Sequence, residues 1–152
     1  MDKRTISRND KTTELATFYL GDALCGIDIR SIQEINRLID MTRVPQAPDY
    51  VLGVLNLRGE IVTVIDLGKK LGLSPATITS NSKNIIINYQ NENVGLLVDK
   101  IGDVLEIDTR NIEPAPANLE EIQGRFFKGV LKDKKVLVGI LDLDEALKDK
   151  DQ

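Results

Sequence analysis

Arg58 is the residue whose type and position most directly suggest a chemical role. It stands in "VLNLRGEIVTVIDL", residues 54–67, where Arg58-Gly59 interrupt two apolar runs. A glycine between runs rich in β-branched residues predicts a β-hairpin, and a three-residue loop would place Gly59 in the left-handed region. Arg58 has no such conformational reason, because asparagine or aspartate makes the better turn. An arginine at such a tip is either a solvated charge or one half of a specific ion pair.

Glu34 is a candidate partner for Arg58. Ile29, Ile32 and Ile35 recur at a spacing of three, which predicts one stripe of a short helix and places Glu34 beside Ile32. A guanidinium can hold a carboxylate with two hydrogen bonds, which lysine does less well. An Arg58–Glu34 pair next to exposed aliphatic side chains would border an apolar groove, a feature of protein-interaction sites.

Groups for catalysis and metal binding are few. The chain has no histidine, which removes the usual general base and the commonest transition-metal ligand. Cys25 lies in an apolar stretch and is interpreted as a small buried hydrophobic residue. Asp144 and Glu145 open a final helix, where acidic residues favour the N-terminus, in preference to a metal site. We therefore expect no catalytic residue, no metal and no cofactor, although an enzyme that uses carboxylates in a polar pocket stays an alternative.

Composition narrows the class of protein. The 152 residues suffice for one domain or two very small ones, and 41% are apolar while only 4% are aromatic, which predicts an aliphatic core. A net charge of −4 argues against nucleic acid and anionic lipid, and a small-barrel nucleic-acid binder would need a basic face with stacking aromatics. No apolar segment is long enough to span a bilayer and no signal-peptide pattern opens the chain, so we expect a cytoplasmic protein.

Many short apolar segments divide the chain. Residues 1–12 predict a loose tail, residues 14–29 a hairpin around Gly21-Asp22, and residues 84–107 a second hairpin with its turn at 90–93. Residues 74–82 have the composition of a linker, and 149–152 form a second tail. One domain is therefore expected over residues 13–148.

The second half of the chain resembles the first. With a shift of 76, "GVLNLRGEIVTVIDLGKKL" (53–71) aligns without a gap on "GVLKDKKVLVGILDLDEAL" (129–147). With a shift of 69, the apolar pattern of residues 26–35 falls on residues 95–104. This register predicts an ancient duplication with halves at about 14–73 and 83–147, each offering about five strands. The sequence leaves open whether each half forms its own barrel or the halves exchange strands.

The duplication also supplies an internal comparison. The strand over residues 61–65 is apolar on both faces, which predicts cover on both sides. At the hairpin tip the first half has "NLRG" (56–59), whereas the second has "KDKK" (132–135). The fold alone therefore does not demand an arginine and a glycine at this tip.

Five blocks occur in order along the chain: "GIDI" with "IQEI" (26–35), "VLGVLNLRGEIVTVIDL" (51–67), "VGLLVDKIGDVLEI" (94–107), "PAP" (114–116) and "VLVGILDL" (136–143). In this combination they resemble the CheW-like family of bacterial chemotaxis proteins. The resemblance runs from about Glu14 to Leu147. It implies an all-β fold with a few short helices, in which two five-stranded SH3/OB-like β-barrel subdomains share an apolar interface.

The resemblance also implies partners and sites. Such proteins are non-catalytic adaptors that couple transmembrane chemoreceptors to the histidine kinase CheA. They bind the receptor's cytoplasmic hairpin tip in a groove between the barrels and pair with the kinase regulatory domain. By matching motif, the receptor site would include Ile32, Glu34, Arg58 and Val104. The residues that shape the hairpin or lie near the kinase and other binding surfaces would be Gly53, Asn56, Leu57, Gly59 and Gly95.

The same resemblance sets the remaining expectations. The protein would be a monomer when free and would be recruited from the cytoplasm to membrane receptor arrays, without nucleic acid or direct membrane insertion. The alternative is a CheW-like coupling module of a related signalling system, with a non-motility output or a linked receiver domain.

Overall fold

The computed structural model describes residues 11–37, 40–114 and 124–148. The predicted tail at 149–152 and most of the tail at 1–12 lie outside these residues, while Thr12 already begins the first strand. The described strands are β1 (Thr12–Leu20), β2 (Ala23–Asp28), β3 (Ile32–Arg37), β4 (Val51–Leu57), β5 (Glu60–Asp66), β6 (Lys83–Tyr89), β7 (Glu92–Val98), β8 (Lys100–Asp108), β9 (Phe127–Asp133) and β10 (Val136–Leu141). The helical segments are the short 3-10 turns η1 (Ile29–Ser31) and η2 (Thr109–Asn111) and the helices α2 (Leu67–Lys70) and α4 (Leu143–Leu147).

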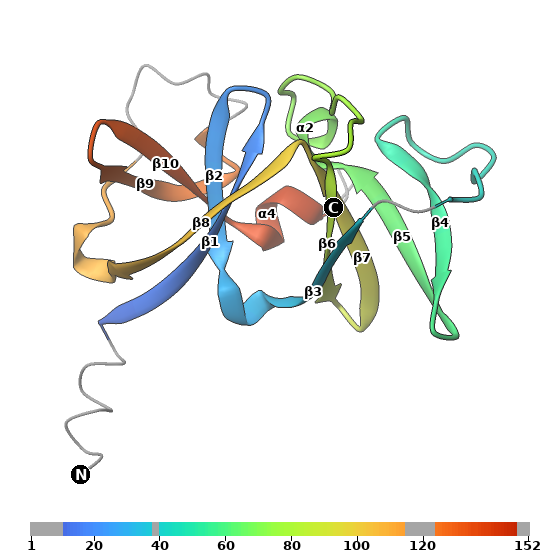
Figure 1. The fold of residues 1–152 in the computed structure, drawn as a ribbon, viewed down its shortest axis with the longest axis horizontal. Helices are drawn as coiled ribbons and strands as arrows, with labels where there is room; N and C mark the ends of the chain where they lie inside the picture. The colour runs from blue at the N-terminus through green and yellow to red at the C-terminus, as the bar shows by residue number, and fades with distance from the viewer. Residues whose placement is uncertain (1–10, 38–39, 115–123, 149–152) are drawn as a thin grey trace, which may run out of the picture.

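The strands form two five-stranded sheets that lie next to each other (Figure 1). One has the order β8-β1-β2-β10-β9 and the other β3-β6-β7-β5-β4. The first sheet therefore takes β1 and β2 from the first half of the chain and three strands from the second. The second sheet takes β6 and β7 from the second half and three strands from the first. The two halves exchange strands, which answers the question that the sequence left open.

The duplicated elements occupy equivalent positions in the two sheets. The β4–β5–α2 unit recurs 76 residues later as β9–β10–α4, and Asp66 and Asp142 each cap the helix of their unit. The strand β5 pairs in parallel with β7, as β10 does with β2. The two sheets are thus related by the repeat.

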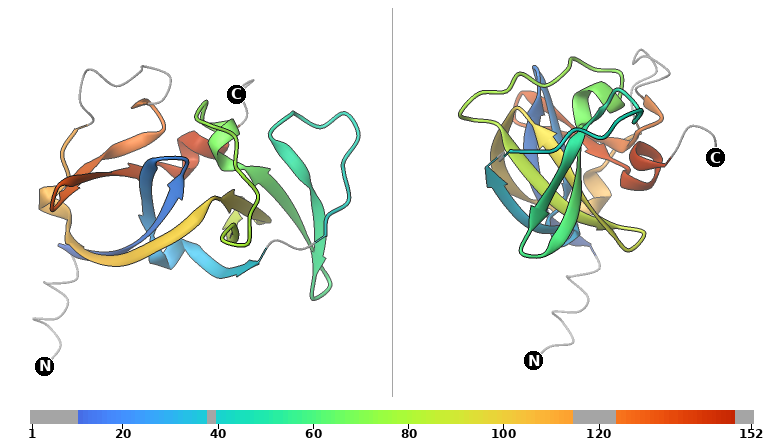
Figure 2. Two further views of the ribbon diagram at one scale, coloured as in Figure 1. Left: turned by 45° about the horizontal axis from the view of Figure 1, so that its top comes forward. Right: turned by 90° about the vertical axis from the view of Figure 1, so that its right-hand side faces the viewer.

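Each sheet curls until its two edges almost meet (Figure 2). Past β3, Thr42 forms a single antiparallel bridge with Val54 of β4, and past β8, Glu113 forms the same bridge with Val130 of β9. Glycine allows this close approach, because a Cβ on Gly53 would lie 2.6 Å from the carbonyl oxygen of Thr42. The predicted five-stranded barrel subdomains are therefore present, each closed by one bridge.

Three hydrophobic clusters form the core. One fills the interior of the first sheet around Leu15 and Val138, and another fills the second around Val62 and Ile86. The largest lies between the sheets, where Phe18 of the first faces buried residues of the second. The region where the two sheets meet is therefore packed, and a groove between them is confined to its rim.

The helix predicted from Ile29, Ile32 and Ile35 is wrong, because this segment is η1 followed by β3. The pairing of β3 with β6 shifts between Ile32 and Glu34, which marks a bulge. An extra residue in a bulge lets two side chains three positions apart lie on one face of a strand. The spacing that resembles a helix is therefore the signature of a bulged strand.

Two other predictions need correction at the level of single residues. The hairpin loops have two residues rather than more: Arg58-Gly59 joins β4 to β5, and Gln90-Asn91 joins β6 to β7. The strand over 61–65 is covered only in part, because Val62, Val64 and Ile65 are buried, whereas Thr63 is half-buried and Ile61 is 59% exposed.

Candidate functional site: an ion pair and two apolar edge strands

The tip of the β4–β5 hairpin is a tight two-residue turn. Arg58 and Gly59 both have positive φ values, 53° and 87°, as two-residue hairpin turns of this kind require. The side chain of Asn56 accepts a hydrogen bond of 2.9 Å from the amide of Gly59 and so fastens the turn. Leu57 packs under it against the cluster inside the second sheet. An arginine thus occupies a backbone conformation that favours glycine or asparagine.

Arg58 forms the ion pair that the sequence suggested. Its guanidinium donates to the carboxylate of Glu34 on β3, and Asn36 donates to the same carboxylate at 2.8 Å. The Arg58 guanidinium, and secondarily the Asn36 amide, hold the pKa of Glu34 below its usual value. The pair connects the hairpin to β3, which occupies the opposite edge of the same sheet.

The ion pair lies at the mouth of the second barrel and does not line a groove between the barrels. Glu34 is opposite Ile86, whose side chain belongs to the cluster inside this barrel. A hollow there is lined by Glu34, Arg58, Val62 and Ile86. The pair therefore covers the end of a barrel and points away from the rim between the sheets.

The apolar residues of β3 face the other way. Ile32 and Ile35 lie opposite Ile87 and Ile85, which both belong to the core between the sheets. Ile32 is half-buried against that core, whereas Ile35 is 41% exposed. The bulge in β3 is what brings these two isoleucines onto one face while Glu34 projects from the other.

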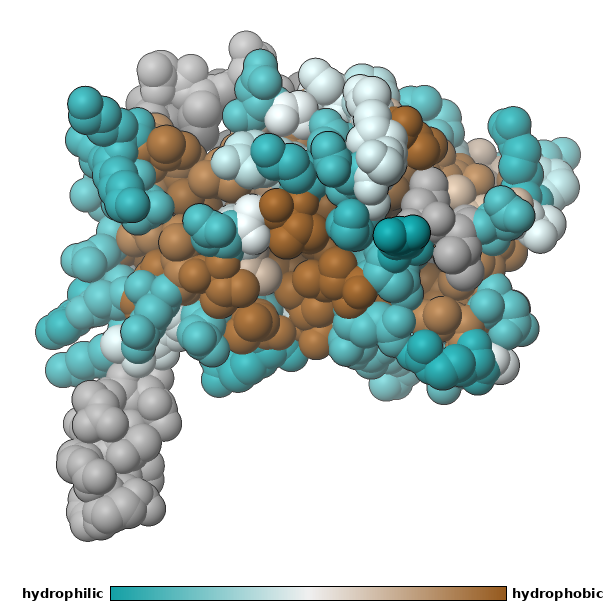
Figure 3. Space-filling view, viewed as in Figure 1, coloured by the Kyte–Doolittle hydropathy of each residue, from teal (hydrophilic) through white to brown (hydrophobic). Residues whose placement is uncertain are grey.

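The repeat places an equivalent pair on β8. Ile101, the counterpart of Ile32, is opposite Phe18 and packs against the same core, and Val104, the counterpart of Ile35, is 52% exposed. The pairing of β8 with β1 also shifts between these two positions. In Figure 1 both edge strands cross the same face of the molecule, and Figure 3 shows hydrophobic residues gathered in the middle of that face. We call Ile32, Ile35, Ile101 and Val104 the edge-strand patch.

The structure thus divides the predicted site into two. Glu34 and Arg58 meet at the barrel mouth, while Ile32 and Val104 belong to the edge-strand patch. Ile35 and Ile101 were missed, although the shift of 69 in the repeat pairs them with Val104 and Ile32. The alignment of the two halves was therefore the sequence signal that could have identified Ile35 and Ile101.

The two remaining glycines of the predicted site are explained by packing. Gly53 allows the bridge to Thr42, as described above. A Cβ on Gly95 would lie 2.4 Å from the side-chain oxygen of Asn84 on the neighbouring strand. Gly53 therefore lets the second barrel close, whereas Gly95 leaves room for the Asn84 side chain.

Other candidate groups have structural roles within the described residues. Cys25 is buried in the core, and this burial raises the pKa of its thiol to about 12. Asp144 and Glu145 lie in the first turn of α4, which Asp142 caps by accepting from the Glu145 amide at 3.2 Å. No group of three or more metal-ligating side chains occurs in the described part of the chain, and no described helix has the length and hydropathy to cross a membrane.

These observations first define a class of protein: an all-β protein of two strand-exchanged barrels that carries apolar edge strands and one ion-paired hairpin. The chain belongs to the family of the CheW-like domain, which matches residues 14–151. It is 33% identical to the chemotaxis protein CheW of Bacillus subtilis over 90% of this chain and 88% of that protein. It is 31% identical to the chemotaxis protein CheW of Treponema pallidum over 94% of this chain and 86% of that protein.

A solved structure supports the same assignment. The scaffolding protein TtCheW of Thermoanaerobacter tengcongensis superposes with a TM-score of 0.83 at 30% identity, over 92% of this chain and 90% of that one. The predicted membership of this family and the predicted fold class are thereby confirmed.

Proposed function

We propose that this chain is a non-catalytic scaffold protein of chemotaxis that couples chemoreceptors to the histidine kinase CheA. Its membership in the CheW-like family, at about a third identity over nearly the whole chain, carries this proposal. The relatives in Bacillus subtilis and Treponema pallidum are chemotaxis proteins, and the solved relative is a scaffolding protein. In this proposal the chain acts in the cytoplasm and reaches the membrane only by binding receptors.

The edge-strand patch is the proposed receptor site. A receptor tip is a helical hairpin, and such a helix binds by placing an aliphatic stripe into an apolar depression. Ile32 and Ile101 would form the floor, because they pack against the core, and Ile35 and Val104 would form the exposed sides. Four aliphatic side chains on two edge strands match the chemistry of that partner.

The Arg58–Glu34 pair has a supporting role in this proposal. It would hold β3 in position from the opposite face, so that Ile32 and Ile35 keep their alignment on the patch. Asn56, Leu57 and Gly59 would shape the hairpin that delivers Arg58.

The kinase would be bound through its regulatory domain, which in this family has the same fold. The free chain would be a monomer, and single contacts could be weak, because repeated contacts in an array raise the effective concentration of each partner.

Replacing Val104 with aspartate tests the receptor site. A carboxylate on an apolar contact loses its hydration on binding, so recovery of Val104→Asp with receptor-containing membranes should fall about tenfold, equivalent to roughly 1.4 kcal/mol. Ile78→Asp is the matched control, because Ile78 is 59% exposed and lies outside both edge strands. Equal recovery of the two folded variants would overturn the assignment of the patch.

Arg58→Ala completes the same experiment. We expect a folded protein, because an exposed ion pair contributes only about 0–1 kcal/mol, with weaker receptor coupling than wild type. Glu34→Gln should weaken coupling equally if Arg58 acts through this carboxylate. Kinase binding should survive in all these variants, and its loss would show that the changes act on the whole fold.

A further inference from the structure

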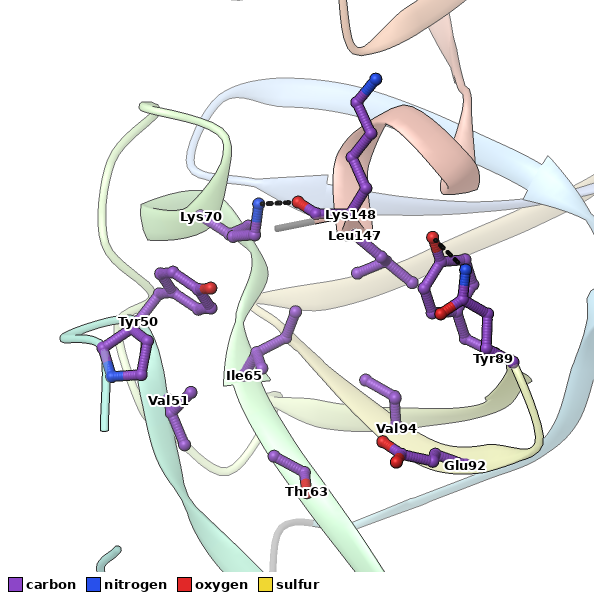
Figure 4. Close-up of a pocket in the computed structure, with 12 residues that line it drawn as sticks. Tyr50, Val51, Thr63, Ile65, Lys70, Tyr89, Glu92, Val94, Leu147 and Lys148 are labelled. Carbon is purple, nitrogen blue, oxygen red and sulfur yellow. Dashed lines mark hydrogen bonds between the residues drawn. The ribbon is translucent and has the colours of Figure 1, made fainter. Parts of the chain in front are cut away.

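A second hollow lies over β4, β5 and β7, on the face of the second sheet that also carries Ile32. It has a volume of about 380 Å³ and is enclosed by β4, β5 and β7, by Lys70 at the end of α2 and by the end of α4 (Figure 4). None of the residues that line this pocket belongs to the edge-strand patch, although Tyr89 comes from β6, which pairs with β3. Its floor is apolar, with Val51, Ile65 and Val94 from three strands.

The repeat shows that this pocket is not an inevitable product of the fold. Shifted by 76 or 69, the positions of Tyr50, Lys70 and Tyr89 become hydrophobic residues that are 4% exposed or less. These counterparts are Phe126, Ala146 and Leu20, all members of the core between the sheets. The same positions are therefore filled core in one half and the walls of a hollow in the other.

One exchange of side chains explains the difference. In the first sheet Phe127 lies over Gly139, where an added Cβ would come within 2.9 Å of the ring. The equivalent pair in the second sheet is Val51 beside Thr63. Valine does not reach as far as phenylalanine, so space remains above Thr63.

Charged groups lie at opposite ends of the pocket. Lys70 is only 7% exposed, its ammonium lies 5.1 Å from the centre of the Tyr50 ring, and it donates to the carbonyl oxygen of Lys148 at 3.4 Å. Glu92 lines the end away from Lys70, as Figure 4 shows. A ligand with a carboxylate at the Lys70 end and an apolar body would match both the Lys70 ammonium and the apolar floor.

The pocket also continues along β5. A neighbouring hollow shares Thr63 and Glu92 with it and extends to Gln33 of β3 and to Ile61, which is exposed on the same face of β5 as Thr63. An elongated depression with both apolar and polar walls fits an extended chain better than a compact molecule.

We propose that this depression binds an extended acidic–apolar peptide segment of a partner protein, with a carboxylate at Lys70 and an aliphatic side chain over Val51, Ile65 and Val94. The four residues of the edge-strand patch do not line this depression, and the proposal does not rest on the adaptor role.

A nuclear magnetic resonance titration of the full chain tests this site. The probe is the tetrapeptide acetyl-Val-Leu-Glu-Val-amide, and the matched probe has glutamine in place of glutamate. The glutamate peptide should produce saturable shifts of the amides around Thr63, Val94 and Lys148, with about tenfold weaker binding of the glutamine peptide. Absence of saturable shifts, or shifts centred on β3 and β8, would overturn the proposal.

Two variants make the test specific. The double variant Val51→Phe with Thr63→Gly copies the Phe127–Gly139 pair, which the first sheet already accommodates, and should abolish binding in a folded protein. Lys70→Met should remove the preference for glutamate. If the preference for glutamate persists in folded Lys70→Met, Lys70 only caps α4 and does not hold the carboxylate. If binding persists in the folded double variant, the pocket does not bind the peptide.

Discussion

At the scale of single residues, Asn84 is a polar side chain inside an aliphatic barrel. It is fully buried, and neither atom of its amide has a hydrogen-bond partner among the described residues. Its counterpart in the first barrel is Leu15, which packs over Gly26 as Asn84 packs over Gly95. The repeat therefore shows that leucine fits the space that this asparagine occupies.

Asn84→Leu should stabilise the protein. Removing a buried amide without a partner and adding apolar contact should raise the free energy of unfolding by about 1–2 kcal/mol in urea titrations. The reverse change, Leu15→Asn, should lower it by roughly 3 kcal/mol or more. A loss of stability in Asn84→Leu would mean that the amide is hydrogen-bonded in solution.

Two aspartates should make the free energy of unfolding depend on pH in the acid range. The Arg30 guanidinium lowers the pKa of Asp28 to about 2, and Arg110 does the same for Asp108. An unfolded aspartate has a pKa of about 3.9, so the stability from each pair is present above about pH 4 and is lost as the pH falls towards 2.

The double variant Arg30→Gln with Arg110→Gln measures this contribution. Its urea midpoint should lie below that of wild type at pH 6, and the difference should shrink to nothing near pH 2. Arg43→Gln, a change at another exposed arginine, should show no such convergence. A difference that is constant with pH would contradict the assigned ion pairs.

At the scale of elements, the two helix caps differ although the repeat makes them equivalent. Asp66 and Asp142 both accept from the amide three residues later. Asp66 also accepts from the amide of Ala76 with both carboxylate oxygens, at 3.1 and 3.0 Å. It therefore holds the segment between the two halves against α2.

Asp66→Ala should cost more stability than Asp142→Ala. Loss of a cap alone costs about 1 kcal/mol, and the partly buried amide of Ala76 that Asp66→Ala leaves unpaired should bring the cost of this variant to roughly 2 kcal/mol. Urea unfolding of the two variants measures both values. Equal costs would show that the contact with Ala76 contributes nothing.

The secondary-structure elements also show which features of the fold could be predicted from the sequence alone. Hairpins were predictable, because alternating apolar residues and turn residues are local signals. The bulge in β3 was not, because a three-residue spacing arises equally from a helix and from a bulged strand, and only pairing with β6 distinguishes them. The Arg58–Glu34 contact was predicted from the chemistry of the two side chains. The face of β3 on which Glu34 lies was not predicted, because it depends on the bulge.

At the scale of the whole molecule, short connections account for the exchange of strands. Three residues, Ile29–Ser31, join β2 to β3, and Asp99 alone joins β7 to β8. For β3 to take the place of β8 beside β1, it would have to run parallel to β2, and such a crossover needs roughly a dozen residues. The chain must therefore continue into the other sheet.

It follows that neither half should fold as a monomer. Fragments 1–78 and 79–152, separated within the segment between the halves, should each give the circular dichroism of an unfolded chain, because each sheet needs strands from both. An equimolar mixture should recover the signal of the intact protein in one cooperative unfolding transition. A single fragment that folds as a monomer would require β3 to return across β2, and would show that the three-residue connection does not force the exchange.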